Sequence, residues 1–142
     1  MDTKKLALII GNSDGIGLGL TRRLLDLGWW VQGLSRSSSP LEHQCYDHEI
    51  ADVASDEFPE LLAKAAAAKP NLCVYCPGIG EALDLDRLEQ ERVVFEVNLM
   101  GAVKMFAAVL PMMIGRGSGQ ILVLSSLADG MLSPEAPSYS AS

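Results

Sequence analysis

A glycine-rich segment near the amino terminus has the composition of a loop that binds the phosphates of a nucleotide. The apolar run Leu6–Ile10 precedes it, a helical pattern follows it, and its residues are Gly11, Asn12, Ser13, Asp14, Gly15, Ile16 and Gly17. Glycines let a backbone approach a pyrophosphate closely, and the helix N-terminus offers free N–H groups. The spacing G-x-x-x-G-x-G is not the common G-x-G-x-x-G, and any tight turn also favours glycine. The strand-to-helix context favours dinucleotide binding over a simple turn.

An arginine stands where the second predicted strand ends. In dinucleotide-binding folds an acid about 20 residues after the glycine loop binds the ribose 2′-hydroxyl. This sequence has Ser35-Arg36 there and no acid. A guanidinium offers a planar fork of donors that suits a 2′-phosphate, so the pair favours NADP over NAD. The alternative interpretation is that Arg36 is a solvated surface arginine. The negative charge of Asp14 also weighs against NADP, because it would repel a phosphate placed nearby.

The elements that must position these residues alternate along the chain. Four continuous apolar runs predict buried strands: Leu6–Ile10, Trp29–Leu34, Leu72–Tyr75 and Ile121–Leu124. A weaker strand is predicted at 46–50. Helices are predicted between most of them, over Gly17–Leu27, Phe58–Lys69, Leu85–Glu96 and Asn98–Ile114. The short connection between 34 and 46 predicts a loop. We expect an α/β doubly wound, mostly parallel, Rossmann-like sheet with helices on both faces.

Composition narrows the classes of function. The 142 residues suit one domain, and 49% hydrophobic with 20% charged residues can form a core. The net charge of −7 makes general binding to nucleic-acid backbones a poor hypothesis. The apolar runs are too short for a signal peptide or a membrane span. We therefore expect a cytoplasmic protein that binds neither nucleic acid nor membranes.

The cysteines and histidines predict neither disulfides nor a metal site. Cys45, Cys73 and Cys76 are an odd number, and nothing indicates secretion. Residues three apart on a strand, such as Cys73 and Cys76, point to opposite faces, and no second pair completes a metal site. His43 and His48 are interpreted as loop and strand-edge residues rather than catalysts.

In their order along the chain, these segments resemble the short-chain dehydrogenase/reductase family. Gly11, Gly15 and Gly17 match its T-G-x-x-x-G-x-G loop, with Ile10 in place of threonine. Asp52-Val53 matches an acidic pair after the third strand, which in the family binds the adenine amino group. The segment Tyr75-Cys76-Pro77-Gly78 stands where the family has N-N-A-G, and only its glycine matches. The resemblance implies that Cys76, Pro77 and Gly78 lie beside the cofactor.

The same resemblance implies a catalytic set. Asn98 matches the family's asparagine, Ser126 follows the last predicted strand, and Tyr139 lies 13 positions after Ser126, as in the family. Tyr139 would then be the general acid and base, Ser126 would stabilise the substrate oxygen, and Asn98 would hold a relay water. Taken one at a time, Tyr139 could be a surface residue and the other two could be caps.

The family's catalytic lysine falls four residues after the tyrosine, at the position following Ser142. Its charge lowers the tyrosine pKa from about 10, which assists catalysis near neutral pH. We therefore expect residues 1–142 to be a single, incomplete NAD(P)-binding domain, truncated on its C-terminal side and inactive by itself.

Together these features predict an NADP-preferring oxidoreductase, with NAD as the second choice of cofactor. It transfers hydride between the nicotinamide and a small-molecule carbonyl or alcohol substrate, and we expect a homo-oligomer. The alternative is a non-catalytic dinucleotide-binding or interaction module that ends at Ser142. A nucleotide hydrolase is disfavoured, because the glycine segment lacks the Gly-Lys-Ser/Thr ending of that class.

Overall fold

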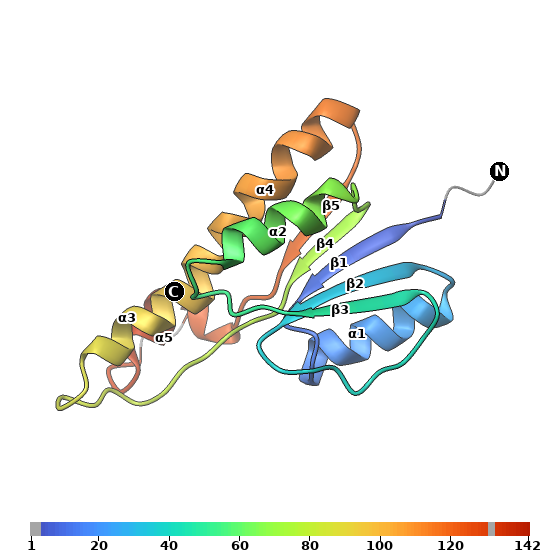
Figure 1. Ribbon diagram of the computed structural model, residues 1–142. Coiled ribbons are helices and arrows are strands. Elements are labelled where there is room, and N and C mark those ends of the chain that lie inside the picture. The colour runs from blue at the N-terminus through green and yellow to red at the C-terminus, as the bar shows by residue number, and fades with distance from the viewer. Residues whose placement is uncertain (1–3, 131–132) are drawn as a thin grey trace.

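The computed structural model describes residues 4–130 and 133–142, and in these residues five parallel strands form one sheet (Figure 1). The strands are β1 (Leu6–Ile10), β2 (Trp30–Ser35), β3 (Tyr46–Ile50), β4 (Leu72–Tyr75) and β5 (Gln120–Val123). Their order across the sheet is β3-β2-β1-β4-β5. The order reverses between β1 and β4, where doubly wound sheets bind ligands at the carboxyl ends of the strands.

Helices cover both faces of the sheet, which confirms the predicted doubly wound α/β fold. Helix α1 (Gly15–Asp26) lies on one face, and α2 (Phe58–Ala67) and α4 (Gly101–Arg116) lie on the other (Figure 1). Successive strand residues serve opposite cores: Ile9 packs with the α1 side, and Leu8 and Ile10 pack with the α2 and α4 side. This explains why β1 is apolar without alternation.

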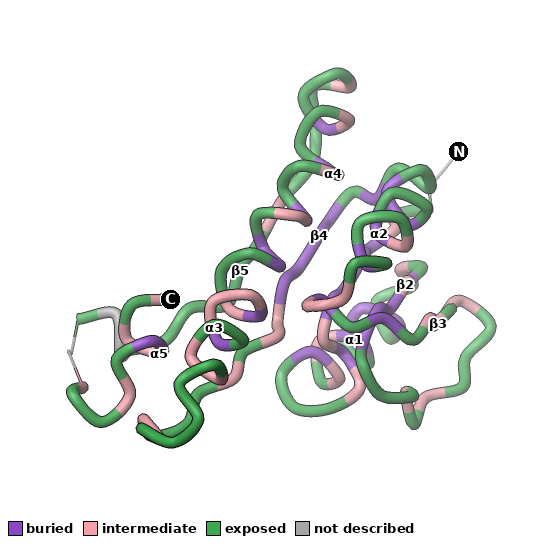
Figure 2. Tube along the Cα trace, turned by 60° about the vertical axis from the view of Figure 1, so that its left-hand side comes forward, coloured by how far each residue is buried: buried purple, intermediate pink, exposed green. Residues whose placement is uncertain are grey.

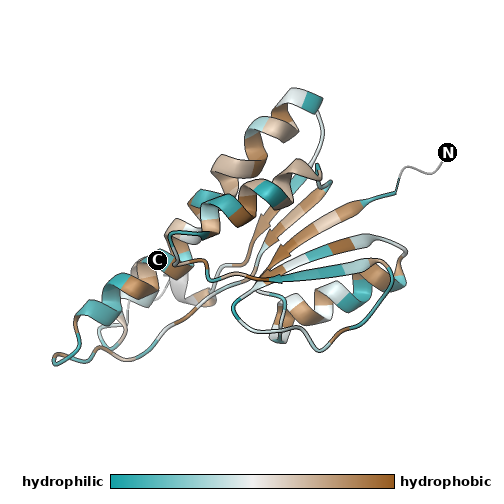
Figure 3. Cartoon of the chain, in the orientation of Figure 1, coloured by the Kyte–Doolittle hydropathy of each residue, from teal (hydrophilic) through white to brown (hydrophobic). Residues whose placement is uncertain are grey.

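The predicted strands lie within one residue of the observed ones, and the expected loop after β2 contains no helix in residues 36–45. Burial differs sharply between the strands. All four residues of β4 are buried, whereas β5 is mostly exposed (Figure 2). The hydropathy colouring shows the same central strands as the most apolar part of the sheet (Figure 3). The glycine segment therefore rests on a rigid, buried centre.

The predicted break between two helices near residue 97 is wrong. Helix α3 (Glu89–Phe95) continues through a π-helical turn, η1 (Glu96–Met100), into α4. The resulting helix, Glu89–Arg116, is long and apolar enough to cross a membrane by length and composition alone. Its α4 part runs along the sheet and contacts α2. One helix of this kind is weak evidence for a membrane span, and 33% of its apolar window is buried.

The last described elements gather beyond the carboxyl ends of the strands. A short 3₁₀-helix, η2 (Leu127–Gly130), follows β5, and α5 (Pro137–Ala141) packs against α3. Figure 1 shows α3 and α5 extending past the carboxyl ends of the strands, away from the amino terminus. The glycine segment and the residues predicted to be catalytic lie at this end of the sheet.

Candidate functional site

The glycine segment turns tightly between β1 and α1. Gly11 has a φ of +78°, a left-handed conformation that favours glycine, and its N–H donates to the Leu34 carbonyl at 2.7 Å. A side chain at Gly11 would also meet the Pro77 ring at 2.9 Å. Pro77 thus packs directly on the turn, where the family pattern has a different residue. The loop leads into the amino end of α1, whose first residue is Gly15.

A cavity of about 230 Å³ lies over this loop at the switch point of the sheet. It brings together ten of the residues predicted to bind the dinucleotide: Gly11, Ser13, Asp14, Ser35, Arg36, Asp52, Val53, Cys76, Pro77 and Gly78. Four segments far apart in the sequence supply them. The cavity therefore joins the segments predicted to contact the phosphates, the ribose 2′-phosphate and the adenine.

Four predicted cofactor residues lie outside this cavity. Asn12 is fully buried, and its Nδ2 donates to the Tyr46 hydroxyl at 2.8 Å and to Thr21 Oγ1 at 3.2 Å. Gly17 is buried where α1 touches the loop, Gly15 begins α1, and Ile16 lines a second cavity. Asn12 therefore ties the loop to α1 and β3 with its side chain, and it lines neither cavity.

Two polar side chains of the smaller cavity, Arg36 and Asp52, differ in the hydrogen bonds that they form. Arg36 is exposed, and no hydrogen bond or ion pair engages its guanidinium among residues 4–130 and 133–142. Asp52 is exposed, and its Oδ1 accepts from the Ala54 N–H at 2.9 Å, which closes a local turn. The cavity therefore presents one exposed cation, Arg36, and two exposed acids, Asp14 and Asp52. Arg36 and Asp52 follow β2 and β3, which lie on the same side of the switch point.

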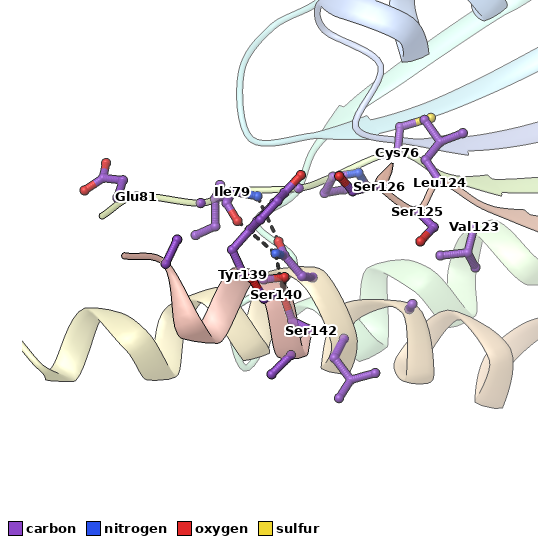
Figure 4. A pocket seen from close by; sticks show the side chains of 18 of the residues that line it. Cys76, Ile79, Glu81, Val123, Leu124, Ser125, Ser126, Tyr139, Ser140 and Ser142 are labelled. Atoms are coloured by element: carbon purple, nitrogen blue, oxygen red, sulfur yellow. Dashed lines mark hydrogen bonds between the residues drawn. The ribbon is translucent and has the colours of Figure 1, made fainter. Parts of the chain in front are cut away.

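A larger cavity of about 1040 Å³ adjoins the first, and the two share a wall made of Cys76, Pro77, Gly78 and Ile79. All three predicted catalytic residues line it: Asn98, Ser126 and Tyr139. Figure 4 shows Tyr139 reaching from α5 toward the side on which Ser126 lies. The structure thus brings the predicted catalytic set together next to the predicted dinucleotide site.

Asn98 holds three segments together from within the π-helical turn. Its Oδ1 accepts from the Ile79 N–H at 2.8 Å, and its Nδ2 donates to the Ile79 carbonyl at 2.8 Å. The same Nδ2 donates to Ser142 Oγ at 2.9 Å. The amide thereby fixes the loop after β4 and the end of α5. π-Helical turns are frequent at functional sites.

Tyr75 explains how this chain accommodates its departure from the N-N-A-G pattern. Its hydroxyl donates to the Val97 carbonyl at 2.5 Å, which links β4 to the π-helical turn. A side chain at Gly101 would collide with this hydroxyl. Burial is the main cause that raises the pKa of Tyr75, so the hydroxyl stays protonated as a donor. Tyr75 and Gly101 therefore form a matched pair.

Tyr139 sits in a space that one glycine provides. A Cβ atom at Gly80 would collide with the Tyr139 ring. Nearby, the Leu83 N–H donates to the Glu135 carbonyl at 2.6 Å, which ties the loop after β4 to the segment before α5. Sequence reasoning missed Gly80 and Ile79. The only available signal for Gly80 was a second glycine two residues after Gly78.

The cysteines beside the site are protonated thiols. Burial raises the pKa of Cys76 to about 11 and that of Cys73 to about 12. Among the residues that the structure describes, no group of three or more His, Cys, Asp or Glu side chains could hold a metal ion. The ionisable groups that line the larger cavity are Cys76, Glu81, Glu135 and Tyr139.

Comparison with known proteins gives one family. The model of the short chain dehydrogenase family matches residues 5–142. Among curated proteins, oxidoreductase UcpA of Salmonella typhimurium is 29% identical over 144 residues, covering 92% of this chain and 54% of that protein. The chain therefore spans about half the length of this relative.

Solved structures share the fold. A short-chain dehydrogenase from Streptomyces avermitilis is 25% identical with a TM-score of 0.85, covering 98% of this chain and 55% of that one. A short-chain dehydrogenase from Leptospira borgpetersenii with bound NAD+ has a TM-score of 0.85 at 20% identity. It covers 98% of this chain and 60% of that one.

Proposed function

The chain belongs to the short-chain dehydrogenase family, and from this premise we propose that it binds NADP in preference to NAD as part of an oxidoreductase. Residues 1–142 would form one nucleotide-binding unit. The observation that carries the proposal is the pair of adjoining cavities with one shared wall, Cys76 to Ile79. One cavity has the groups that suit a dinucleotide, and the other has the groups that suit a reacting carbonyl.

The residues of the smaller cavity fit a dinucleotide. The left-handed Gly11 and the amino end of α1 suit the pyrophosphate, because they allow close approach and present N–H groups. Asp52 would accept from the adenine amino group. The exposed guanidinium of Arg36 would bind a 2′-phosphate by charge-assisted hydrogen bonds. The Leptospira structure contains NAD+, so the preference for NADP rests on Arg36 alone.

In the larger cavity, the protein residues would manage the substrate oxygen. When bound, the dinucleotide supplies or accepts the hydride in exchange with a carbonyl or alcohol carbon. Tyr139 would exchange a proton with the substrate oxygen, and Ser126 would donate a hydrogen bond to it. Asn98 would keep the shared wall and α5 in place through its amide, in addition to holding a relay water. The substrate class is a small carbonyl or alcohol compound.

A nucleotide titration tests the cofactor proposal. We expect NADPH to bind more tightly than NADH, and Arg36→Ala to weaken NADPH binding by about tenfold or more while NADH binding changes less than about twofold. Arg22→Ala is the matched control, since Arg22 is an exposed arginine of α1 that lines neither cavity. Equal affinities of the wild-type chain for the two nucleotides would overturn the preference.

Turnover separates the oxidoreductase from a purely binding role. We propose that the 142 residues as they stand bind NADPH without carbonyl-dependent oxidation, because the family's lysine position follows Ser142. A chain extended with the residues that follow in its coding sequence should gain oxidation, and Tyr139→Phe should abolish it. Oxidation by the 142-residue chain, or none in an extended chain that binds NADPH, would contradict the proposal.

Self-association and a cytoplasmic location complete the proposal. Five apolar side chains repeat at helical spacing along one exposed stripe from the π-helical turn through α4: Leu99, Val103, Phe106, Leu110 and Ile114. An exposed apolar stripe of this kind favours contact with another copy of the chain. Cell fractionation with an antibody tests the location.

A further inference from the structure

A histidine on the edge strand contacts the residue that precedes Arg36. His48 of β3 lies with its Nε2 2.7 Å from Ser35 Oγ, and Ser35 ends β2. Ser35 is 4% exposed and lines the smaller cavity beside Arg36. His48 itself lines neither cavity. The contact with Ser35 therefore connects His48 to the lining of this cavity.

The Ser35 hydroxyl closes a small turn around Arg36. Its Oγ donates to the Ser37 carbonyl at 2.9 Å, so the ring of atoms spans the Arg36 backbone. A hydroxyl carries one hydrogen, which this bond uses. The imidazole must then donate its Nε2–H to Ser35 Oγ. His48 thus fixes the rotation of the Ser35 hydroxyl, and the hydroxyl fixes the turn that presents the guanidinium.

The charge state of His48 supports a steering rather than a phosphate-binding role. Partial burial lowers the pKa of His48 more than the neighbouring Asp47 carboxylate raises it, so the imidazole is neutral near pH 7. On β3 its ring also lies 6.1 Å from the Tyr46 ring, and on β2 it pairs in register with Gly33, which has no charge. A neutral ring offers a phosphate no net charge.

We propose that His48 is a positioning residue for 2′-phosphate selectivity, acting through Ser35 to hold the turn that carries Arg36. The inference rests on the proposed NADP preference. Without the Nε2–H donor, the Ser35 hydroxyl can rotate and the turn loses a fixed geometry. A guanidinium that must be ordered on binding binds more weakly than one held in place.

The test compares two nucleotides that differ by one phosphate, adenosine 2′,5′-bisphosphate and 5′-AMP, on the 142-residue chain. We expect His48→Leu and Ser35→Ala each to lower the preference for the bisphosphate by about threefold to tenfold, and His48→Leu to leave AMP binding nearly unchanged. His48→Gln should restore the preference, because its amide can donate to Ser35 Oγ. The double variant should lose no more than either single one. His43→Leu is the control, since the His43 ring accepts from the Cys45 N–H instead.

The outcomes separate the inference from the function on which it rests. An unchanged preference in both His48→Leu and Ser35→Ala, with the wild-type preference intact, overturns the positioning role. Equal wild-type affinities overturn the NADP preference. In that case the backbone NMR signals of Arg36 and Ser37 still decide: His48→Leu must shift them, and His48→Gln must restore them, or the positioning role is also wrong. Should His48→Leu not fold, Ser35→Ala and His48→Gln carry the same comparison.

Discussion

At the scale of single residues, the glycines of the phosphate loop serve different physical needs. Gly11 needs a left-handed backbone and room for Pro77. Gly17 needs room, because a side chain there would collide with the Gly11 carbonyl oxygen. Gly19, two residues further along α1 and exposed, has open space around it. The sequence pattern alone treats these glycines alike, whereas the packing distinguishes them.

Gly17→Ala and Gly19→Ala should therefore change stability in opposite directions. The new methyl group at Gly17 meets backbone, so we expect a loss of about 1–3 kcal/mol. At exposed Gly19, alanine should add up to about 1 kcal/mol by its better helix propensity. Urea unfolding of both variants measures the difference. Equal effects of the two substitutions would show that α1 does not press on the loop.

Cys76 offers a chemical probe of the shared wall. With a pKa of about 11, only about one thiol in a thousand is ionised at pH 8, so alkylation should be slow. The rate should rise about tenfold per pH unit up to the pKa, because the thiolate reacts. NADPH should slow it, since Cys76 lines the smaller cavity. Mass spectrometry after iodoacetamide treatment measures the rate, with buried Cys73 as the internal reference. Rapid labelling at pH 8 would contradict the burial.

The types and positions of residues along the chain predicted many of the residues that line the two cavities. They did not predict the direction in which individual side chains point. The line-up of Arg36, Asp52 and Pro77 around one cavity follows from their places after parallel strands. The inward turn of Asn12 does not, because it depends on Tyr46 and Thr21, which lie on other elements. The position of Gly80 under Tyr139 likewise depends on contacts between distant segments.

At the scale of elements, the π-helical turn is where sequence periodicity stopped being informative. Strands β1, β3 and β4 match their predicted ranges. The run of β1 lies between Lys5 and Gly11, and the run of β4 begins after Pro70 and Asn71, so polar residues, glycine and proline mark these boundaries. The junction of α3 and α4 has no such boundary. Its form depends on the Tyr75 hydroxyl reaching the Val97 carbonyl and on Asn98 reaching Ile79, which are tertiary contacts.

Asn98→Ala should release the loop after β4. The variant removes both hydrogen bonds to Ile79, so we expect the Ile79 amide to exchange with solvent roughly tenfold faster or more. Asn71→Ala is a matched control at the amino ends of the strands, where Asn71 Oδ1 accepts from the Leu6 N–H at 2.9 Å. It should speed exchange at Leu6 and leave Ile79 unchanged. Hydrogen exchange followed by NMR measures the exchange rates of both amides. An unchanged rate at Ile79 in Asn98→Ala would show that Asn98 does not hold this loop in place.

At the scale of the whole molecule, apolar surface is distributed unevenly. The α1 face of β1 and β4 is well covered, whereas β5 and the stripe along α4 remain exposed, with Phe106 39% and Leu110 42% accessible. Complete burial of a fully exposed side chain of this size contributes about 1.5–3 kcal/mol, and each of these partly exposed side chains would contribute a fraction of that on contact between copies.

Charged residues on this stripe should therefore shift the molecule toward monomers. We expect light scattering to show the wild-type chain above monomer mass, and Phe106→Glu with Leu110→Glu to lower the mass. Ala63→Glu is the control, because Ala63 is exposed on α2, away from the stripe. A wild-type chain that is monomeric at high concentration would contradict the proposed self-association.

The wall common to both cavities has a thermodynamic consequence. Cys76 to Ile79 line the cavity proposed for the nucleotide on one side and the cavity with the proposed catalytic residues on the other, and Asn98 accepts a hydrogen bond from the Ile79 N–H. A ligand that shifts this wall from one side changes the free energy of binding on the other. Such coupling is reciprocal by necessity: whatever factor a nucleotide imposes on the affinity for a second ligand, that ligand imposes on the nucleotide. The free energy that couples the two ligands across these four consecutive residues is therefore a measurable property of the fold.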